Sequence, residues 1–279
     1  MFLNSVLIAV SLEDHSNNDC LLVTVISHGK EDGQIAAADE DFFVEDLWEN
    51  FVGDNCESLI GKPKLFFIDS NRGWLKDTGA SMELKQIRSI GKNNENLIKV
   101  IPKSADLLVM YSTTEGYSSF HNETDGSRFI QALCEEFKIN LEDDDNLLSK
   151  LTRVSRKVAL VKQSNTPGKP ELNVGAQMAN IESTLTKLFF LFNKSSIEPK
   201  CINPLIMTDD MYYDYSNANR GIALIFNHEY FDDKPRKEGT KKDGDDLKAV
   251  LEELQFDVRY HMNLKVNDIF DILFKGKTL

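Results

Sequence analysis

Apolar residues along the chain form two kinds of pattern, short continuous runs and helical stripes. Six runs are rich in branched and aromatic residues, and their length is typical of strands buried on both faces of a sheet. The predicted strands are Cys20–Ile26, Lys64–Ile68, Asp106–Tyr111, Leu188–Phe192, Ile222–Phe226 and Phe256–Tyr260.

Helical periodicity separates several of these runs. Apolar residues recur at i, i+3, i+4 and i+7 within residues 247–254, and a longer stripe of the same kind covers residues 147–161. Phe43–Phe51 and Ser127–Phe137 are further predicted helices. Strands that alternate with helices predict an α/β fold with a mostly parallel six-stranded sheet, covered by helices on both faces.

Composition narrows the possible partners. The chain has 279 residues, of which 41% are hydrophobic, so it can bury a substantial core. Its 45 acidic and 32 basic residues give a net charge of −13. This charge argues against nucleic acid or an anionic membrane as a partner, because both carry negative charge.

Cysteine usage predicts a reducing, cytoplasmic location. Cys20, Cys56, Cys134 and Cys201 lie far apart, and none has the spacing of a zinc site, so we expect no metal and no cofactor. The apolar start Met1–Val10 lacks a basic flank and is too short to span a membrane, so we expect it to belong to a buried helix or a loosely packed end.

Several long segments of the chain resemble the motifs of a single protein family. Residues 61–73, GKPKLFFIDSNRG, are similar to the strand that ends in the catalytic cysteine of that family, whose pattern closes in Gln-Ala-Cys. Four more segments resemble other caspase motifs: Asp19–Gly29, Asp106–Tyr117, Gly126–Glu135 and Arg220–Phe231. The resemblance is to an inactive homologue of the insect effector type, and it implies the caspase fold.

The order of these segments differs from the family order. Residues 1–100 resemble the second half of the large-subunit region, and residues 101–193 resemble the small-subunit region. Residues 194–219 are predicted as a linker, and residues 220–279 resemble the first part of the large-subunit region. We expect one domain with circularly permuted connectivity. The alternative is a non-functional chimera, made by joining tandem gene copies.

The resemblance implies roles for three residues of the site. His28 matches the general base of the family, and Gly29 matches a donor of its oxyanion hole. The spacing from His28 to Asn71 is close to the ~50 residues expected between base and nucleophile. However, Asn71 stands at the nucleophile position, and an amide side chain cannot attack a peptide bond.

The pocket for a substrate aspartate is altered as well. Caspases bind this side chain with two arginines and a glutamine, and the matching positions here are His121, Lys237 and Asp69. Arg236 is displaced by one position from the arginine it would replace, and Phe120 stands for a tryptophan of the neighbouring pocket. A carboxylate at Asp69 would repel an acidic substrate.

These changes predict a pseudoenzyme that modulates an active caspase in apoptosis by heterodimerisation. The last strand of the small-subunit region mediates pairing in caspases, so the resemblance assigns contact with an active caspase or a second copy to Lys187, Leu188, Phe189, Phe190, Leu191 and Phe192. The alternative function is a cysteine-type endopeptidase homologue with residual or altered activity.

Overall fold

A six-stranded sheet forms the centre of the protein in a computed structural model that describes residues 9–73, 102, 104–138, 145–160, 176–191 and 211–274. In spatial order the strands are β10 (Asp257–Met262), β9 (Asn219–Asn227), β1 (Asn18–Ile26), β4 (Lys64–Asp69), β5 (Leu107–Tyr111) and β8 (Asn180–Ser183). Neighbouring strands are parallel except β8, which pairs antiparallel with β5. The mostly parallel α/β fold is therefore confirmed.

Five of the six predicted strands are present. The central strands β1 and β4 are buried along their whole length, in agreement with their continuous apolar runs. The remaining predicted strand, Leu188–Phe192, is wrong. The described part of this segment lies outside the sheet, where Leu188 makes an isolated bridge to Tyr212, whereas Phe192 falls outside the described residues.

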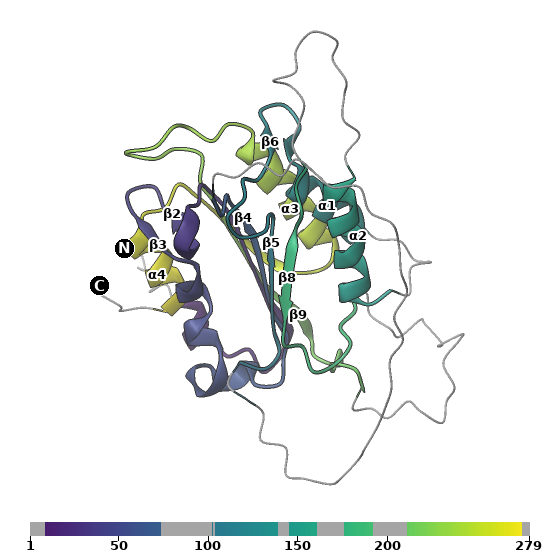
Figure 1. Cartoon of the computed structure of the whole chain (residues 1–279). Coiled ribbons are helices and arrows are strands. Elements are labelled where there is room, and N and C mark those ends of the chain that lie inside the picture. Colours follow the sequence, from purple (N-terminus) through teal and green to yellow (C-terminus); the bar gives the residue numbers. More distant parts are fainter. Residues whose placement is uncertain are drawn as a thin grey trace.

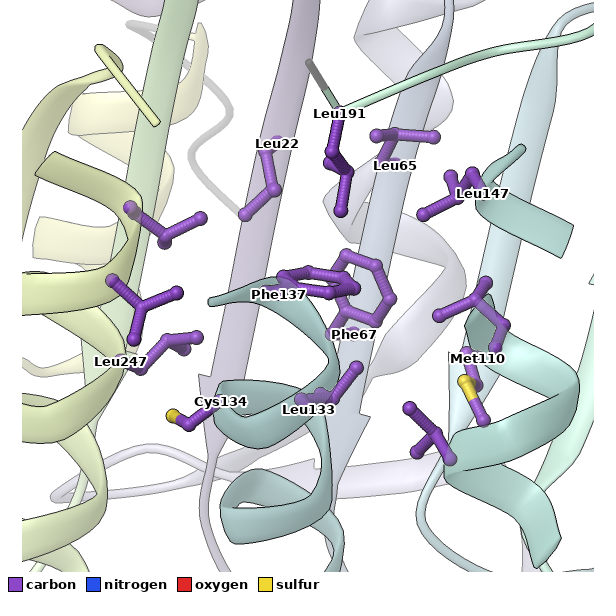
Figure 2. Packing of buried hydrophobic residues seen from close by; sticks show 14 of the residues in the cluster. Leu22, Leu65, Phe67, Met110, Leu133, Cys134, Phe137, Leu147, Leu191 and Leu247 are labelled. Carbon is purple, nitrogen blue, oxygen red and sulfur yellow. The ribbon is translucent and has the colours of Figure 1, made fainter. Parts of the chain in front are cut away.

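Three helices cover one face of the sheet (Figure 1): α1 (Arg128–Phe137), α2 (Leu147–Ala159) and α3 (Thr240–Glu253). The Ser127 side chain caps α1 by accepting hydrogen bonds from the amides of Phe129 and Ile130. Figure 2 shows the side chains between this layer and the strands, where Phe67 of β4 meets Phe137 of α1 edge to face at 5.6 Å. These helices confirm the predictions for the three regions.

The opposite face is covered by α4 (Val266–Phe274) and by short 3-10 turns. The turns are η1 (Val10–Leu12), η2 (Glu31–Gly33), η3 (Val44–Leu47), η4 (Glu49–Phe51), η5 (Gly53–Asn55) and η6 (Glu57–Leu59). The predicted helix Phe43–Phe51 is therefore wrong, since the chain forms two such turns there. Aromatic and β-branched residues have modest helix propensity, and a nine-residue segment is too short to stabilise a helix alone.

Two small hairpins complete the described elements, β2 (Gln34–Ala36) with β3 (Asp41–Phe43), and β6 (His121–Asn122) with β7 (Gly126–Ser127). Segments that are distant in sequence lie side by side. Strand β9 lies between β10 and β1, and α4 packs against η1. In addition, the amide of Leu188 donates to the carbonyl of Met211 at 2.9 Å. No helix in the described ranges is long and apolar enough to cross a membrane.

Candidate functional site

The candidate site lies where the neighbouring parallel strands β1 and β4 end. Ile26 is paired with Asp69, so the residues that follow both strands emerge at the same edge of the sheet. This edge is where ligand sites form in open parallel sheets. The strand register therefore brings His28 and Asn71 into one pocket of about 330 Å³. The pocket lining consists of His28, Gly29, Lys30, Ala36, Asp41, Asn71, Lys234 and Pro235.

His28 has the environment of a neutral base. Its Nε2 lies 2.9 Å from the carbonyl oxygen of Pro235, and because a carbonyl can only accept, Nε2 must carry the hydrogen. The Nδ1 atom of the neutral ring is therefore left without a proton. The ring also contacts Phe231 at 4.7 Å between centroids. Burial lowers the pKa of His28, although the Pro235 carbonyl acts in the opposite direction.

Gly29 is required by a close approach of the two strand ends. A Cβ atom at this position would lie 2.2 Å from the carbonyl oxygen of Asn71 and 2.9 Å from the Cβ of Ser70. Any larger residue would push the end of β4 away. Glycine therefore allows the segments that carry His28 and Asn71 to approach each other closely. The oxyanion role of its amide stays a prediction from the resemblance.

Asn71 is held by the segment that follows β5. Its Oδ1 accepts hydrogen bonds from the amide of Ser119 at 2.8 Å and from the Oγ of Ser119 at 3.0 Å. Ser70, the adjacent hydroxyl, is buried and does not line the pocket of His28. This arrangement agrees with the expectation that neighbouring side chains point in opposite directions.

The described cysteines lie elsewhere. Cys20, Cys56 and Cys134 are buried, unpaired and absent from the pocket lining. Burial raises the pKa of the Cys20 and Cys134 thiols to about 12 and also raises that of Cys56. A thiol with a raised pKa carries little thiolate at neutral pH, so these three side chains are poor nucleophiles.

Asp69 and Lys237 form a buried pair beside this pocket. The Nζ of Lys237 lies 3.7 Å from Oδ2 of Asp69, and it donates to the backbone carbonyls of Ser27 at 2.6 Å and Asp69 at 3.2 Å. Arg236 is not part of this cluster. Its guanidinium pairs with Glu229 and Glu238 and stacks on Tyr230. Of the two candidate cations, only Lys237 meets Asp69.

His121 and Phe120 are each engaged by residues of this chain. The Nε2 of His121 lies 3.2 Å from Oδ2 of Asp243, a fully buried carboxylate in the first turn of α3. The Phe120 ring lies under the guanidinium of Arg128, 4.9 Å from its centroid. The amide of Phe120 donates to the side chain of Gln177 at 2.8 Å. Both predicted pocket residues are therefore held by internal contacts.

Several residues of the site were missed by the sequence analysis. Pro235 acts through its backbone carbonyl, which has no sequence signal, and Ser119 and Gln177 are polar residues in loops. Asp243 lies in the first turn of α3, where a carboxylate favours the helix dipole. It also accepts from the amide of Ser127 at 2.8 Å and from Nε2 of Gln131 at 2.9 Å.

Comparisons with known proteins agree with this α/β sheet and its site at the strand ends. The Caspase domain family model matches residues 2–190 and 220–275. The chain therefore belongs to the caspase family.

Individual relatives match part of the chain. Caspase drICE of Drosophila melanogaster is 38% identical over 182 residues, covering 65% of this chain and 52% of the relative. Caspase-1 of Spodoptera frugiperda is 40% identical over 183 residues, which cover 66% of this chain and 59% of the relative. The chain thus spans about half to three-fifths of the length of these relatives. The crystal structure of the Spodoptera protein matches with a TM-score of 0.55 and 37% identity, covering 67% of this chain and 69% of that one.

Proposed function

We propose that this caspase-family protein is a non-catalytic relative that modulates an active caspase in the cytosol during apoptosis. The observation that carries the proposal is Asn71, an amide that shares a pocket with His28 at the position of the family nucleophile. In other hydrolases with a nucleophile and a base, loss of the nucleophile leaves only the ~10³–10⁴-fold acceleration due to the oxyanion hole and binding.

The charge pair beside the pocket supports the same proposal. A substrate aspartate needs cations that are free to form charge-assisted hydrogen bonds. The ammonium of Lys237 is already engaged by Asp69 and by two backbone carbonyls, and the carboxylate of Asp69 would repel an acidic ligand. Nucleophile and acidic-substrate pocket are thus both altered.

The predicted contact segment is wrong in its described part, because Phe189, Phe190 and Leu191 are buried within the chain and form no edge strand. Heterodimerisation is proposed instead through the free edge of β8. This strand is hydrogen-bonded to β5 on one side only, so its other edge is open to pairing among the described residues. The exposed side chain of Met178 lies just before β8 and adds apolar surface there. A two-fold contact uses the same patch on both partners, so an inactive chain can pair with an active one.

The test is a titration of this protein into an active caspase from the same source, following turnover and the mass of the complex. We expect a mixed dimer and a changed rate. Met178→Lys should weaken both effects, whereas Leu12→Lys, which alters another exposed apolar side chain in η1 beside α4, should not. A titration with no mixed dimer and no change in rate would contradict the proposal.

A second candidate function is a peptidase of altered specificity, which uses Ser70 or a group of the substrate. It is favoured by the retained contact between His28 and the Pro235 carbonyl, which keeps a base poised in the pocket. This function predicts measurable peptide hydrolysis that His28→Ala abolishes. Hydrolysis that survives His28→Ala would come from a contaminant or from another site.

We also propose that the permuted order is the natural one. The position of β9 between β10 and β1, and the contacts between α4 and η1, support it because they join the two ends of the chain in one fold. A chimera made from tandem gene copies would lack a stable fold. A single cooperative unfolding transition, together with a peptide that spans residues 193–219 from the natural protein, would support the permuted chain. Absence of both would favour the chimera.

A further inference from the structure

A groove of about 700 Å³ runs between α1 and α2, which pack side by side, and its lining shares no residue with the His28 pocket. Its walls are one face of each helix, with residues spaced three or four apart. The lining residues are Arg128, Ala132, Glu135 and Glu136 of α1, Arg153, Arg156 and Lys157 of α2, and Leu160 just beyond α2.

The groove carries more cations than anions. Its two carboxylates are used by two of its four cations: Glu136 pairs with Arg153 at 2.6 Å and with Lys157 at 2.8 Å, and Glu135 pairs with Lys157 at 2.7 Å. Within the described ranges, Arg128 and Arg156 have no acidic partner. Two guanidinium groups that have no acidic partner among the described residues therefore line one groove of a chain with a net charge of −13.

Arg128 is already partly withdrawn from water. Its guanidinium lies over the Phe120 ring, and burial lowers its pKa from the ordinary value of an arginine. A partly buried charge without a counter-charge is unfavourable, so a carboxylate from a ligand would be bound strongly there. The planar fork of arginine suits carboxylates in particular.

The groove also offers apolar contact. Ala132 is buried on the α1 side, whereas the side chain of Leu160 is 65% exposed at the end of α2. An apolar side chain of a ligand could cover Leu160 while neighbouring carboxylates pair with the arginines. This combination is typical of sites for short acidic peptide segments.

We propose that the α1–α2 groove binds an acidic segment of a partner protein, with carboxylates on Arg128 and Arg156 and an apolar side chain on Leu160. A short segment fits better than a nucleic acid, because a long polyanion would also meet the acidic surface outside the groove. This binding does not depend on the state of the His28 pocket.

The test uses the full chain and a fluorescein-labelled pentapeptide of two glutamates, one leucine and two aspartates, with fluorescence anisotropy as readout. We expect saturable binding, and we expect Arg128→Gln and Arg156→Gln each to weaken it about tenfold, because each removes a charge-assisted contact. Glu135→Gln should strengthen binding. Lys248→Gln is the matched control, because it removes the same charge from α3 outside the groove.

Three results would overturn the proposal. The first is no saturable binding by a chain that circular dichroism shows to be folded. The second is equal affinity for the corresponding peptide of glutamines and asparagines, or an equal loss of binding in Lys248→Gln. The third is tighter binding of a short single-stranded oligonucleotide than of the acidic peptide.

Discussion

The two strand ends that form the candidate site are stabilised by different kinds of interaction. After β1, His28 is neutral and is held by a backbone carbonyl and by the Phe231 ring. After β4, and on the segments that face it, ionisable side chains engage one another: Asp69 lies beside Lys237, and His121 contacts the buried carboxylate of Asp243. The first region holds its histidine through neutral contacts, whereas in the second region ionisable side chains engage one another within the chain.

This difference explains why one substitution is not expected to recreate a caspase. The base, its orienting carbonyl and the glycine beside it remain in place. Under the proposed function, Asn71 occupies the nucleophile position, and Lys237 and His121 are engaged within the chain by Asp69 and Asp243. A thiol added to the second region would therefore act on a substrate that the pocket does not hold.

The largest expected effect concerns Asp243. Asp243→Ala removes an acceptor used by the ring of His121, the amide of Ser127 and the side chain of Gln131. Buried donors without partners are costly, so the free energy of unfolding should fall by about 4 kcal/mol. Urea unfolding measures this change. Asp243→Asn keeps an acceptor and should cost less, and a loss below about 1 kcal/mol for the alanine variant would contradict the account.

A somewhat smaller effect is expected for Lys237. Lys237→Met leaves the carboxylate of Asp69 buried without its cation, so we expect a loss of about 3 kcal/mol in the free energy of unfolding. The double variant Asp69→Leu with Lys237→Met replaces the pair by apolar side chains and should recover most of that stability. If the double variant were less stable than Lys237→Met alone, the loss of stability would not come from a buried Asp69 carboxylate that lacks its cation.

Stability should also depend on pH, through another buried histidine, His228. His228 follows β9 and is buried, and neither ring nitrogen has a hydrogen-bond partner within the described chain. Burial lowers its pKa to about 4. As the pH falls below the ordinary histidine pKa, the unfolded chain therefore binds a proton at His228 more readily than the folded chain does. Stability should drop by about 2 kcal/mol between pH 7 and pH 5 from this group.

His228→Leu tests this prediction, since it removes the titrating group and leaves no buried donor unpaired. Urea unfolding at both pH values should show a smaller loss on acidification for the variant than for the natural chain. At pH 7 the two proteins should differ by less than about 1.5 kcal/mol. Equal pH dependence in both would mean that His228 does not titrate in this range.

Much of the fold could be predicted from the sequence, because buried strands and amphipathic helices leave long patterns. The failures have physical causes. The apolar run at Leu188–Leu191 packs into a core beside Tyr213 instead of joining the sheet. Strand β8 is short and polar and lies at an edge of the sheet, so it has no apolar run to reveal it. Its place depends on backbone pairing with β5.

The site could be predicted only in part. His28, Gly29 and Asn71 lie together as their motifs suggested, because the strand register brings both strand ends to one edge. The pairing of Lys237 with Asp69 was not predicted, since it depends on the path of the loop after β9. The carbonyl of Pro235 and the buried position of Asp243 also follow from tertiary packing and leave no trace in local sequence.

The most direct test of the central claim is the kcat/KM of Asn71→Cys on a peptide with aspartate at the cleavage position, measured beside an active caspase of the same source. The account predicts that the variant stays at least ~10³-fold below the active enzyme, because Lys237 stays engaged by Asp69, whose carboxylate repels an acidic substrate. Adding Asp69→Gln, His121→Arg and Lys237→Arg should then raise the activity. Full activity of Asn71→Cys alone would contradict the account.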